Sequence, residues 1–159
     1  MLHVETFQVN PLGENCYVVS DETRECVIVD CGAYSTEEFR LITDYISTAN
    51  LKPVRLIATH GHLDHNFGND MVLSEYGLKV EIHARERMNM ESLETQAKNI
   101  FGPHRTIRVP QASVGRYFSD KDTIDFGNHH FDIVETPGHS QGSVFFICDE
   151  EKVAFSGDT

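Results

Sequence analysis

The alternation of apolar and polar residues divides the chain into three parts. In the first thirty residues, short runs typical of strands occur at 4–9, 16–19 and 26–29, and polar segments at 10–14 and 20–24 have the composition of turns. Runs of this length joined by short turns predict an antiparallel meander of strands.

Helical periodicity dominates the middle of the chain. A helix is expected at 35–50, because Ser35 can cap its first turn and Glu38, three residues later, completes a capping box. A second helix follows a stripe of apolar residues and is expected to end at Gly77. A third is expected at 84–100, a polar segment rich in good helix formers.

Further strands are expected between and after these helices, at 54–58, 79–83, 123–126, 131–134, 143–148 and 153–155. The stretch 101–120 is irregular, and it is interpreted either as a loop that covers a substrate or as a plain connection. Strands at both ends around an αβα middle predict an α+β fold with sheets covered by helices. The 159 residues fit a single domain, 1–159.

The composition of the chain argues against several classes of function. The formal net charge is −12, and so acidic a chain repels phosphate backbones, which argues against a nucleic-acid partner. No stretch has the apolar length of a membrane span and no secretory signal is visible, so a cytoplasmic protein without a membrane partner is expected. The four cysteines form no C-x-x-C pair and are expected to be buried free thiols; Cys31 either lies near a site or fills space.

The strongest chemical signal directly follows the apolar strand at 54–58. Three histidines and an aspartate fall within six residues there: His60, His62, Asp64 and His65. Imidazole and carboxylate groups bind zinc, iron and manganese. In an extended segment alternate side chains share a face, so His60, His62 and Asp64 can point the same way. A helix that starts near Asp64 would direct His65 elsewhere, which suits two adjacent metals better than one.

Two later turns carry further candidate ligands. His139 lies in the Thr-Pro-Gly-His-Ser turn after one strand, and Asp158 lies in the Ser-Gly-Asp-Thr turn after another. Each turn alone is a weak signal, but with the first cluster they form a metal-binding pattern.

Four other histidines are interpreted as structural or exposed. His83, at the end of a strand, is expected to be structural, with contact to a substrate as the alternative. His104, His129 and His130 are expected to be exposed to solvent.

With these residues in place, the chain resembles the metallo-β-lactamase-fold hydrolases, in the glyoxalase II-like branch that includes hydroxyacylglutathione hydrolases. The resemblance rests on Asp30 in the Val-Asp-Cys-Gly turn, the histidine cluster at 60–65, His139 and Asp158, in the family's order and at strand ends. It runs from the first strands to Thr159. It implies an αββα sandwich.

The resemblance also implies a metal centre and the residues that form it. Its ligands are His60, His62 and His139 at a first metal, Asp64 and His65 at a second, and Asp158 as the bridge between them. The implied metals are two zinc ions, with iron or manganese as alternatives. Asp64 also orients the nucleophile as a catalytic residue, and Asp30 supports the ligand loops.

The sequence departs from the family at its end. In the family a further histidine, well downstream of the bridging aspartate, completes the second site, whereas this sequence stops at Thr159. The C-terminal part of the fold is therefore expected to be missing. The strands at 144–147 and 153–155 would then leave part of a sheet uncovered, and self-association through that incomplete sheet is expected.

Three functions fit the predicted fold and metal centre, each with a small molecule as the partner. The first is a hydrolase in which a metal-bound hydroxide cleaves a thioester or a related ester or lactone. The second is a mononuclear iron persulfide dioxygenase of the same fold, which would use His60, His139 and Asp158. The third is an inactive metal-binding fragment of a longer hydrolase.

Overall fold

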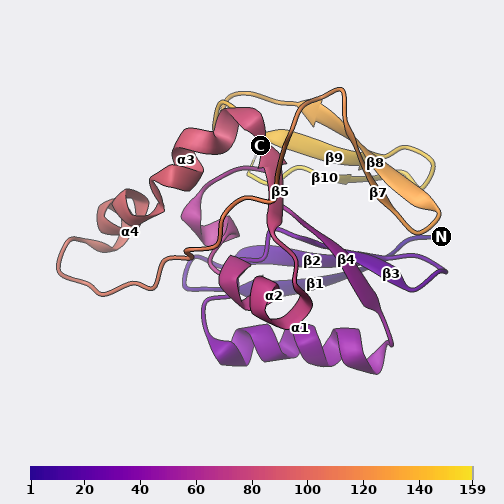
Figure 1. Ribbon diagram of the computed structural model, residues 1–159, viewed down its shortest axis with the longest axis horizontal. Coiled ribbons are helices and arrows are strands. Elements are labelled where there is room, and N and C mark those ends of the chain that lie inside the picture. Colours follow the sequence, from indigo (N-terminus) through magenta and orange to yellow (C-terminus); the bar gives the residue numbers. More distant parts are fainter. Residues whose placement is uncertain (159) are drawn as a thin grey trace.

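Two β-sheets packed face to face form the centre of the protein, as seen in a computed structural model that describes residues 1–158 (Figure 1). The larger sheet has six strands in the order β1-β2-β3-β4-β5-β6, and the smaller has four in the order β10-β9-β8-β7. The strands of the larger sheet are β1(His3–Val9), β2(Glu14–Ser20), β3(Glu25–Val29), β4(Lys52–Ile57), β5(Val80–His83) and β6(Arg116–Phe118). Those of the smaller are β7(Thr123–Phe126), β8(His129–Glu135), β9(Val144–Cys148) and β10(Val153–Phe155).

The larger sheet changes from antiparallel to parallel pairing at β3. Strands β1 to β3 form the expected antiparallel meander, and β3 to β6 pair in parallel. Parallel neighbours need crossover connections, which here contain α1(Thr36–Thr48) and α2(Asn69–Tyr76). As a result the carboxyl ends of β3, β4 and β5 emerge at the same edge of the sheet.

Side chains alternate between two cores along the central strands. In β3, Ile28 packs in the core that includes Phe39 and Ile42 of α1, whereas Val27 and Val29 pack in the core shared with the smaller sheet. The helices α1 and α2 lie together below the larger sheet in Figure 1, and the smaller sheet lies above it. Burial on both faces explains why the central strands read as continuous apolar runs.

Most expected helix boundaries agree with the structure. Ser35 and Glu38 form the expected capping box, and Gly77 ends α2 in the left-handed conformation, with φ at 71°. The helix expected at 84–100 is instead divided into η2(Ala84–Glu86), α3(Arg87–Glu91) and α4(Leu93–Phe101). At the break the Ser92 hydroxyl donates to the carbonyl oxygen of Asn89, a local bond that competes with helical pairing.

The irregular stretch at 101–120 contains a strand that the sequence pattern did not reveal. Strand β6 has three residues and pairs in parallel with β5. A strand this short carries too few residues to show periodicity, so only its tertiary partner identifies it.

The expected layers are present as far as the described residues extend. The helices α1 and α2, the larger sheet and the smaller sheet are three layers of the αββα arrangement, and α3 and α4 extend from its side (Figure 1). Residues 1–158 include no helix that follows β10 to cover the outer face of the smaller sheet. No helix in this part of the chain is long and apolar enough to cross a membrane.

The four cysteines are buried and free, as expected. One expectation about the histidines is wrong: His129 is buried, and its Nδ1 lies 2.8 Å from Asp21 Oδ2. Tertiary packing buries His129, because the turn between β7 and β8 packs against the end of β2. His104 and His130 are exposed, as expected.

Candidate metal centre

The candidate site lies where the parallel strands of the larger sheet end. Asp30 follows β3 and His60 follows β4, and the turns after β8 and β10 bring His139 and Asp158 to the same place. The structure therefore gathers residues that are up to about 130 positions apart in the sequence. All seven residues named from the sequence, Asp30, His60, His62, Asp64, His65, His139 and Asp158, lie in this one region.

A first cluster consists of His60, His62, His139 and Asp158. Each offers one ligand atom, and these atoms all lie within 4.8 Å of one another. His62 Nδ1 lies 2.9 Å from His139 Nε2, which in turn lies 3.2 Å from Asp158 Oδ2. Three imidazole nitrogens and a carboxylate oxygen form a donor set that is typical of zinc and other divalent transition metals.

A chain of hydrogen bonds fixes the orientation of His60. The backbone N–H and the hydroxyl of Thr59 donate to the two carboxylate oxygens of Asp30, at 2.7 and 2.8 Å. Because the hydroxyl proton is used there, His60 Nδ1–H donates to Thr59 Oγ1, at 2.9 Å. Nε2 of His60 therefore carries the free lone pair, and this tautomer is the one that can bind a metal through Nε2.

A second cluster shares Asp158 with the first. It consists of Asp64, His65 and Asp158, and His65 Nε2 lies 3.2 Å from Asp158 Oδ2 and 3.6 Å from Asp64 Oδ2. On the other side of the ring, Nδ1 of His65 donates to Asp30 Oδ2, at 3.0 Å. Asp30 thus orients a histidine of each cluster, His60 through Thr59 and His65 directly.

The extended arrangement in which His60, His62 and Asp64 can point the same way does not occur in the structure. The chain does not stay extended that far, because η1(Leu63–His65) forms a short helical turn. This turn places Asp64 with His65 in the second cluster. The second helix, α2, begins only at Asn69.

The pKa values of the two histidines that Asp30 orients, His60 through Thr59 and His65 directly, differ strongly. Burial, together with the nearby His65, lowers the pKa of His60 to about 4. Burial also acts to lower the pKa of His65, but the Asp30 carboxylate outweighs it and raises that pKa to about 9. Burial acts to raise the pKa of Asp158, but the surrounding histidines, led by His65, hold it below its usual value.

One buried atom indicates what the first cluster lacks. Nε2 of His60 is fully buried and has no hydrogen-bond partner among the described residues. A buried polar atom without a partner is costly, so such atoms in native proteins usually serve a ligand or an ion. This Nε2 atom lies 3.6 Å from Asp158 Oδ2 and within 4.8 Å of the ligand atoms of His62 and His139, so the donor set fits a divalent metal.

Two other groups of acidic residues and histidines do not fit a metal. In the group of Glu14, Asp30 and His65, the Asp30 oxygens already accept from Thr59 and His65. Burial raises the pKa of Glu14 to about 11, so its carboxyl group is protonated at neutral pH. In the group of Asp21, Glu22 and His129, protein donors surround the Asp21 carboxylate.

Close backbone packing near the ligands requires glycine at positions 32 and 157. A Cβ atom at Gly32 would overlap the carbonyl oxygen of Asp64, and one at Gly157 would press against Thr59 Oγ1. Gly157, with φ at 59°, thereby brings the turn of Asp158 down onto the first histidine loop. Asp30 also has a positive φ, 54°, a strained conformation of the kind that is often found at functional sites.

Four polar side chains that support the ligand loop were not identified from the sequence: Asn10, Asn66, Glu86 and Gln96. Asn66 donates to the carbonyl oxygens of His60 and His62, and Asn10 donates to that of Asp64. Gln96 donates to the carbonyl oxygen of Gly61 and accepts from the N–H of Leu63. Their only signal in the sequence is that polar residues occur at positions a helix or turn would bury, and this signal needs the fold to be read.

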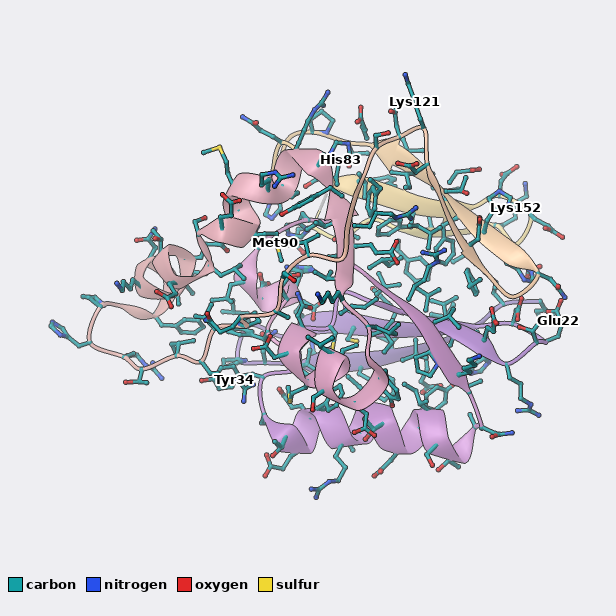
Figure 2. The ribbon with its side chains drawn as sticks, viewed as in Figure 1. Glu22, Tyr34, His83, Met90, Lys121 and Lys152 are labelled. Atoms are coloured by element: carbon teal, nitrogen blue, oxygen red, sulfur yellow. The ribbon has the colours of Figure 1, made fainter. Side chains whose placement is uncertain are left out.

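His83 has the structural role that was expected of it. It ends β5 (Figure 2), its Nε2 lies 2.6 Å from Glu135 Oε2, and its Nδ1 accepts from the N–H of Arg85. Both ring nitrogens are therefore occupied.

A cavity of about 320 Å³ opens beside His62 and His139, with Arg85 and Met88 in its lining.

Comparisons with known proteins agree with this geometry. A family model described as the Metallo-beta-lactamase superfamily matches residues 9–159. The Hydroxyacylglutathione hydrolase GloC of Haemophilus influenzae is 30% identical over 159 residues, which cover 99% of this chain and 71% of that protein. The Probable metallo-hydrolase YqgX of Bacillus subtilis is 30% identical over 151 residues, covering 94% of this chain and 67% of that one.

Solved structures of the same fold superpose closely. The BLEG-1 B3 metallo-beta-lactamase gives a TM-score of 0.84 at 27% identity and covers 99% of this chain and 72% of its own. TTHA1623, solved in a di-iron-bound form, gives a TM-score of 0.79 at 29% identity and covers 98% and 72%. This chain therefore spans roughly seven-tenths of the length of these similar proteins.

Proposed function

Since the chain belongs to the metallo-beta-lactamase superfamily, a family of metal-dependent hydrolases, we propose that it cleaves thioesters with two divalent metals, preferably zinc. One observation supports this most directly: the two clusters of candidate ligands meet at a single carboxylate. Asp158 Oδ2 lies 3.2 Å from both His65 Nε2 and His139 Nε2. A carboxylate between two groups of histidines suits a bridging ligand of two adjacent ions.

The proposed ligands follow the clusters. His60, His62 and His139 would hold the first metal, Asp64 and His65 the second, and Asp158 both. Bound divalent metals lower the pKa of water and polarise a carbonyl group, which is the chemistry that thioester hydrolysis needs.

The side chains of this protein contribute orientation and proton transfer. Asp30 keeps His60 in the tautomer with a free Nε2, through Thr59, and accepts from Nδ1 of His65. Asp64, half-buried next to His65, is the proposed catalytic residue that accepts a proton from the attacking water and orients it.

The cavity beside His62 and His139 is the proposed binding place of the substrate. Its rim includes Arg85, whose side chain is 56% exposed and lies 3.9 Å from Glu135. A cation there suits a substrate with a negatively charged thiol portion, and Met88 offers an apolar surface. Together with the name of the Haemophilus influenzae relative, this supports a hydroxyacyl-glutathione thioester as the first substrate to test.

The test is an assay of thiol release. The protein is loaded with Zn²⁺ and incubated with a hydroxyacyl-glutathione and with an acyl thioester without glutathione, and a lactone is tested in parallel by the acid that its hydrolysis releases. We expect thiol release from the first compound, with loss of that activity when Arg85 is replaced by Glu and retention of bound zinc. No turnover of any thioester by protein that holds two zinc ions would contradict the proposal.

The same preparation decides between the alternatives. Oxygen consumption with a persulfide and a single iron per chain would favour the dioxygenase. Bound metal without any turnover would favour an inactive metal-binding fragment of a longer hydrolase. The second cluster, Asp64 and His65 together with the shared Asp158, is the observation that favours two metals over one.

A further inference from the structure

Glu86 is the most deeply buried carboxylate next to the candidate metal centre, and no metal ligand role falls to it. Glu86 is 0% exposed, and no lysine or arginine among the described residues makes an ion pair with it. A buried charge of this kind is costly unless hydrogen bonds compensate for it. The partners of Glu86 therefore indicate what it does.

Four donors from three segments surround this carboxylate. The N–H of Gly61 donates to Oε1 at 2.6 Å, and the hydroxyl of Ser140 donates to the same oxygen at 2.8 Å. The N–H of Gly142 donates to Oε2 at 2.9 Å, and Asn89 donates to Oε1 at 3.2 Å. A carboxylate has about four lone-pair sites, so these donors satisfy it without a metal.

Two of these three segments carry the histidines of the first cluster. Gly61 lies between His60 and His62, and Ser140 directly follows His139. These loops come from different sheets, and the gap between them closes to 2.9 Å at His62 Nδ1 and His139 Nε2. Glu86 is thus hydrogen-bonded to both loops at the point where they approach each other.

Two glycines give independent evidence of this close fit. A Cβ atom at Gly61 would lie 2.9 Å from Asn89 Cβ, and one at Gly142 would lie 2.8 Å from Glu86 Cγ. Both loops therefore pack against the turn of Glu86 without room for a side chain. This turn begins just beyond His83 and continues into the helix of Met90, both of which are labelled in Figure 2.

The carboxylate stays ionised in this environment. Burial acts to raise the pKa of Glu86, but the hydrogen bonds from Gly61, Ser140, Gly142 and Asn89 outweigh it and keep the pKa below its usual value. Charge-assisted hydrogen bonds are about twice as strong as neutral ones, so an ionised Glu86 holds both loops firmly.

The geometry points to Glu86 as a positioning residue that fastens the His60–His62 loop to the His139 loop and so sets the spacing of the first metal site. The inference rests on the proposed metal centre but not on the proposed thioester chemistry. Outer hydrogen-bond partners of this kind hold ligands at the separation a metal needs, and their loss weakens metal binding.

The test measures metal affinity in three variants that bear on this carboxylate. Glu86→Gln keeps the size of the side chain but replaces one acceptor oxygen by a donor, and it should weaken Zn²⁺ binding roughly 10- to 100-fold. Ser140→Ala and Asn89→Ala each remove one donor to the same oxygen, but only Ser140 lies in a ligand loop. Ser140→Ala should therefore weaken binding about 10-fold and Asn89→Ala by less than about twofold.

Asp21→Asn serves as a matched control for burial. Asp21 is a buried carboxylate that also accepts from four donor groups, but it joins the turn at 22–24 to the turn at 127–128, away from the ligands. Its replacement should lower the free energy of unfolding and leave Zn²⁺ affinity within about twofold of the original. Competition with a chromophoric chelator gives the affinities, and the absorption spectrum of bound Co²⁺ reports the ligand geometry.

The outcomes separate the possibilities. Unchanged Zn²⁺ affinity and Co²⁺ spectrum in Glu86→Gln, with stability lowered as in Asp21→Asn, would overturn the inference. If Glu86→Gln does not fold, equal affinities of Ser140→Ala and Asn89→Ala would overturn it instead. An original protein that binds zinc but cleaves no thioester contradicts the proposed function alone.

Discussion

The two halves of the candidate metal centre are built differently. The halves are divided by chain segment and not by cluster. The first half is the continuous segment 60–65, in which His60 and His65 are buried and are 1% and 4% exposed. In the second half, His139 and Asp158 lie in separate turns of the smaller sheet, with side chains that are 35% and 41% exposed. The first half is held by its own neighbourhood, whereas the second depends on how the two sheets pack.

The hydrogen bonds follow the same division. Asn10, Asn66 and Gln96 all bond to the backbone of the first segment. The His139 turn is joined to the first half through Ser140 and Gly142, which both bond to Glu86. The centre therefore combines a preorganised half with a half that tertiary packing brings to it, and variants should affect the two halves to different degrees.

The largest effect is expected from Asp158→Ala, which removes the residue common to both clusters. Zn²⁺ affinity should fall by more than the roughly 100-fold that is typical for loss of an outer hydrogen-bond partner. The fold should persist, because the side chain is 41% exposed. Asp149→Ala is the control, since that carboxylate is 85% exposed and, within residues 1–158, bonds only to Lys152. Retention of the full metal content in Asp158→Ala would show that Asp158 is not shared.

A smaller effect is expected from Thr59→Val in the first half. The change keeps the shape but removes the hydroxyl between Asp30 and His60, so the tautomer of His60 is no longer fixed. Zn²⁺ affinity should fall roughly 10- to 100-fold, with a loss of about 1–3 kcal/mol in unfolding free energy from the unpaired groups. Isothermal calorimetry and chemical denaturation measure the two quantities.

Thr136→Val provides the matched control for that substitution. Its hydroxyl oxygen is buried and has no hydrogen-bond partner among the described residues. The same chemical change there should leave metal affinity unaltered and stability equal or higher. Similar losses of metal affinity in both variants would contradict the specific role of Thr59.

A pH effect is expected where the two sheets are joined away from the centre. Hydrogen bonds, against the opposing effect of burial, lower the pKa of Asp21 to about 2, and its hydrogen bond raises the pKa of His129. Asp21 therefore adds stability above pH 4 that disappears as the pH falls toward 2, worth about 2 kcal/mol. His129 adds stability below pH 6.5 that disappears as the pH rises through its raised pKa.

The Asp21→Asn variant tests the predicted direction in which stability changes with pH. The variant should be destabilised most between about pH 4 and 6.5, where both members of the pair are charged, and the difference should narrow at either side. Denaturation curves recorded across this range give the comparison. A difference in stability that does not change with pH would contradict the account of this ion pair.

The smallest effect concerns the outer face of the smaller sheet, for which self-association stays a prediction. Val134 is 42% exposed there, and its register partner Phe145 is only partly buried. Val134→Lys should reduce any association measured by sedimentation velocity without changing metal affinity. A monomer at every concentration of the original protein would contradict the prediction.

Local patterns in the sequence predicted the elements that depend on local chemistry. The capping box of Ser35 and Glu38 and the helix end at Gly77 were predicted correctly, because each signal lies within one turn of the feature it controls. The same holds for the crowded histidines at 60–65, which needed no knowledge of the fold to suggest a metal. Their division into two clusters was not predictable from extended geometry, because η1 turns the chain there.

Residues that act through distant partners could not be predicted. Glu86 bonds to groups 25, 54 and 56 positions away, and nothing in its own neighbourhood indicates them. His129 is buried by Asp21, 108 positions away, and strand β6 exists only through its pairing with β5. In each case tertiary contact decides the outcome, and a single sequence does not record tertiary contact directly.

The measurement that tests the central claim most directly is the metal content of the protein after reconstitution with Zn²⁺ and removal of the excess. Elemental analysis should find two ions per chain, one for each cluster, and fewer in Asp158→Ala. One ion or none per chain in the original protein would contradict a shared two-metal centre at Asp158.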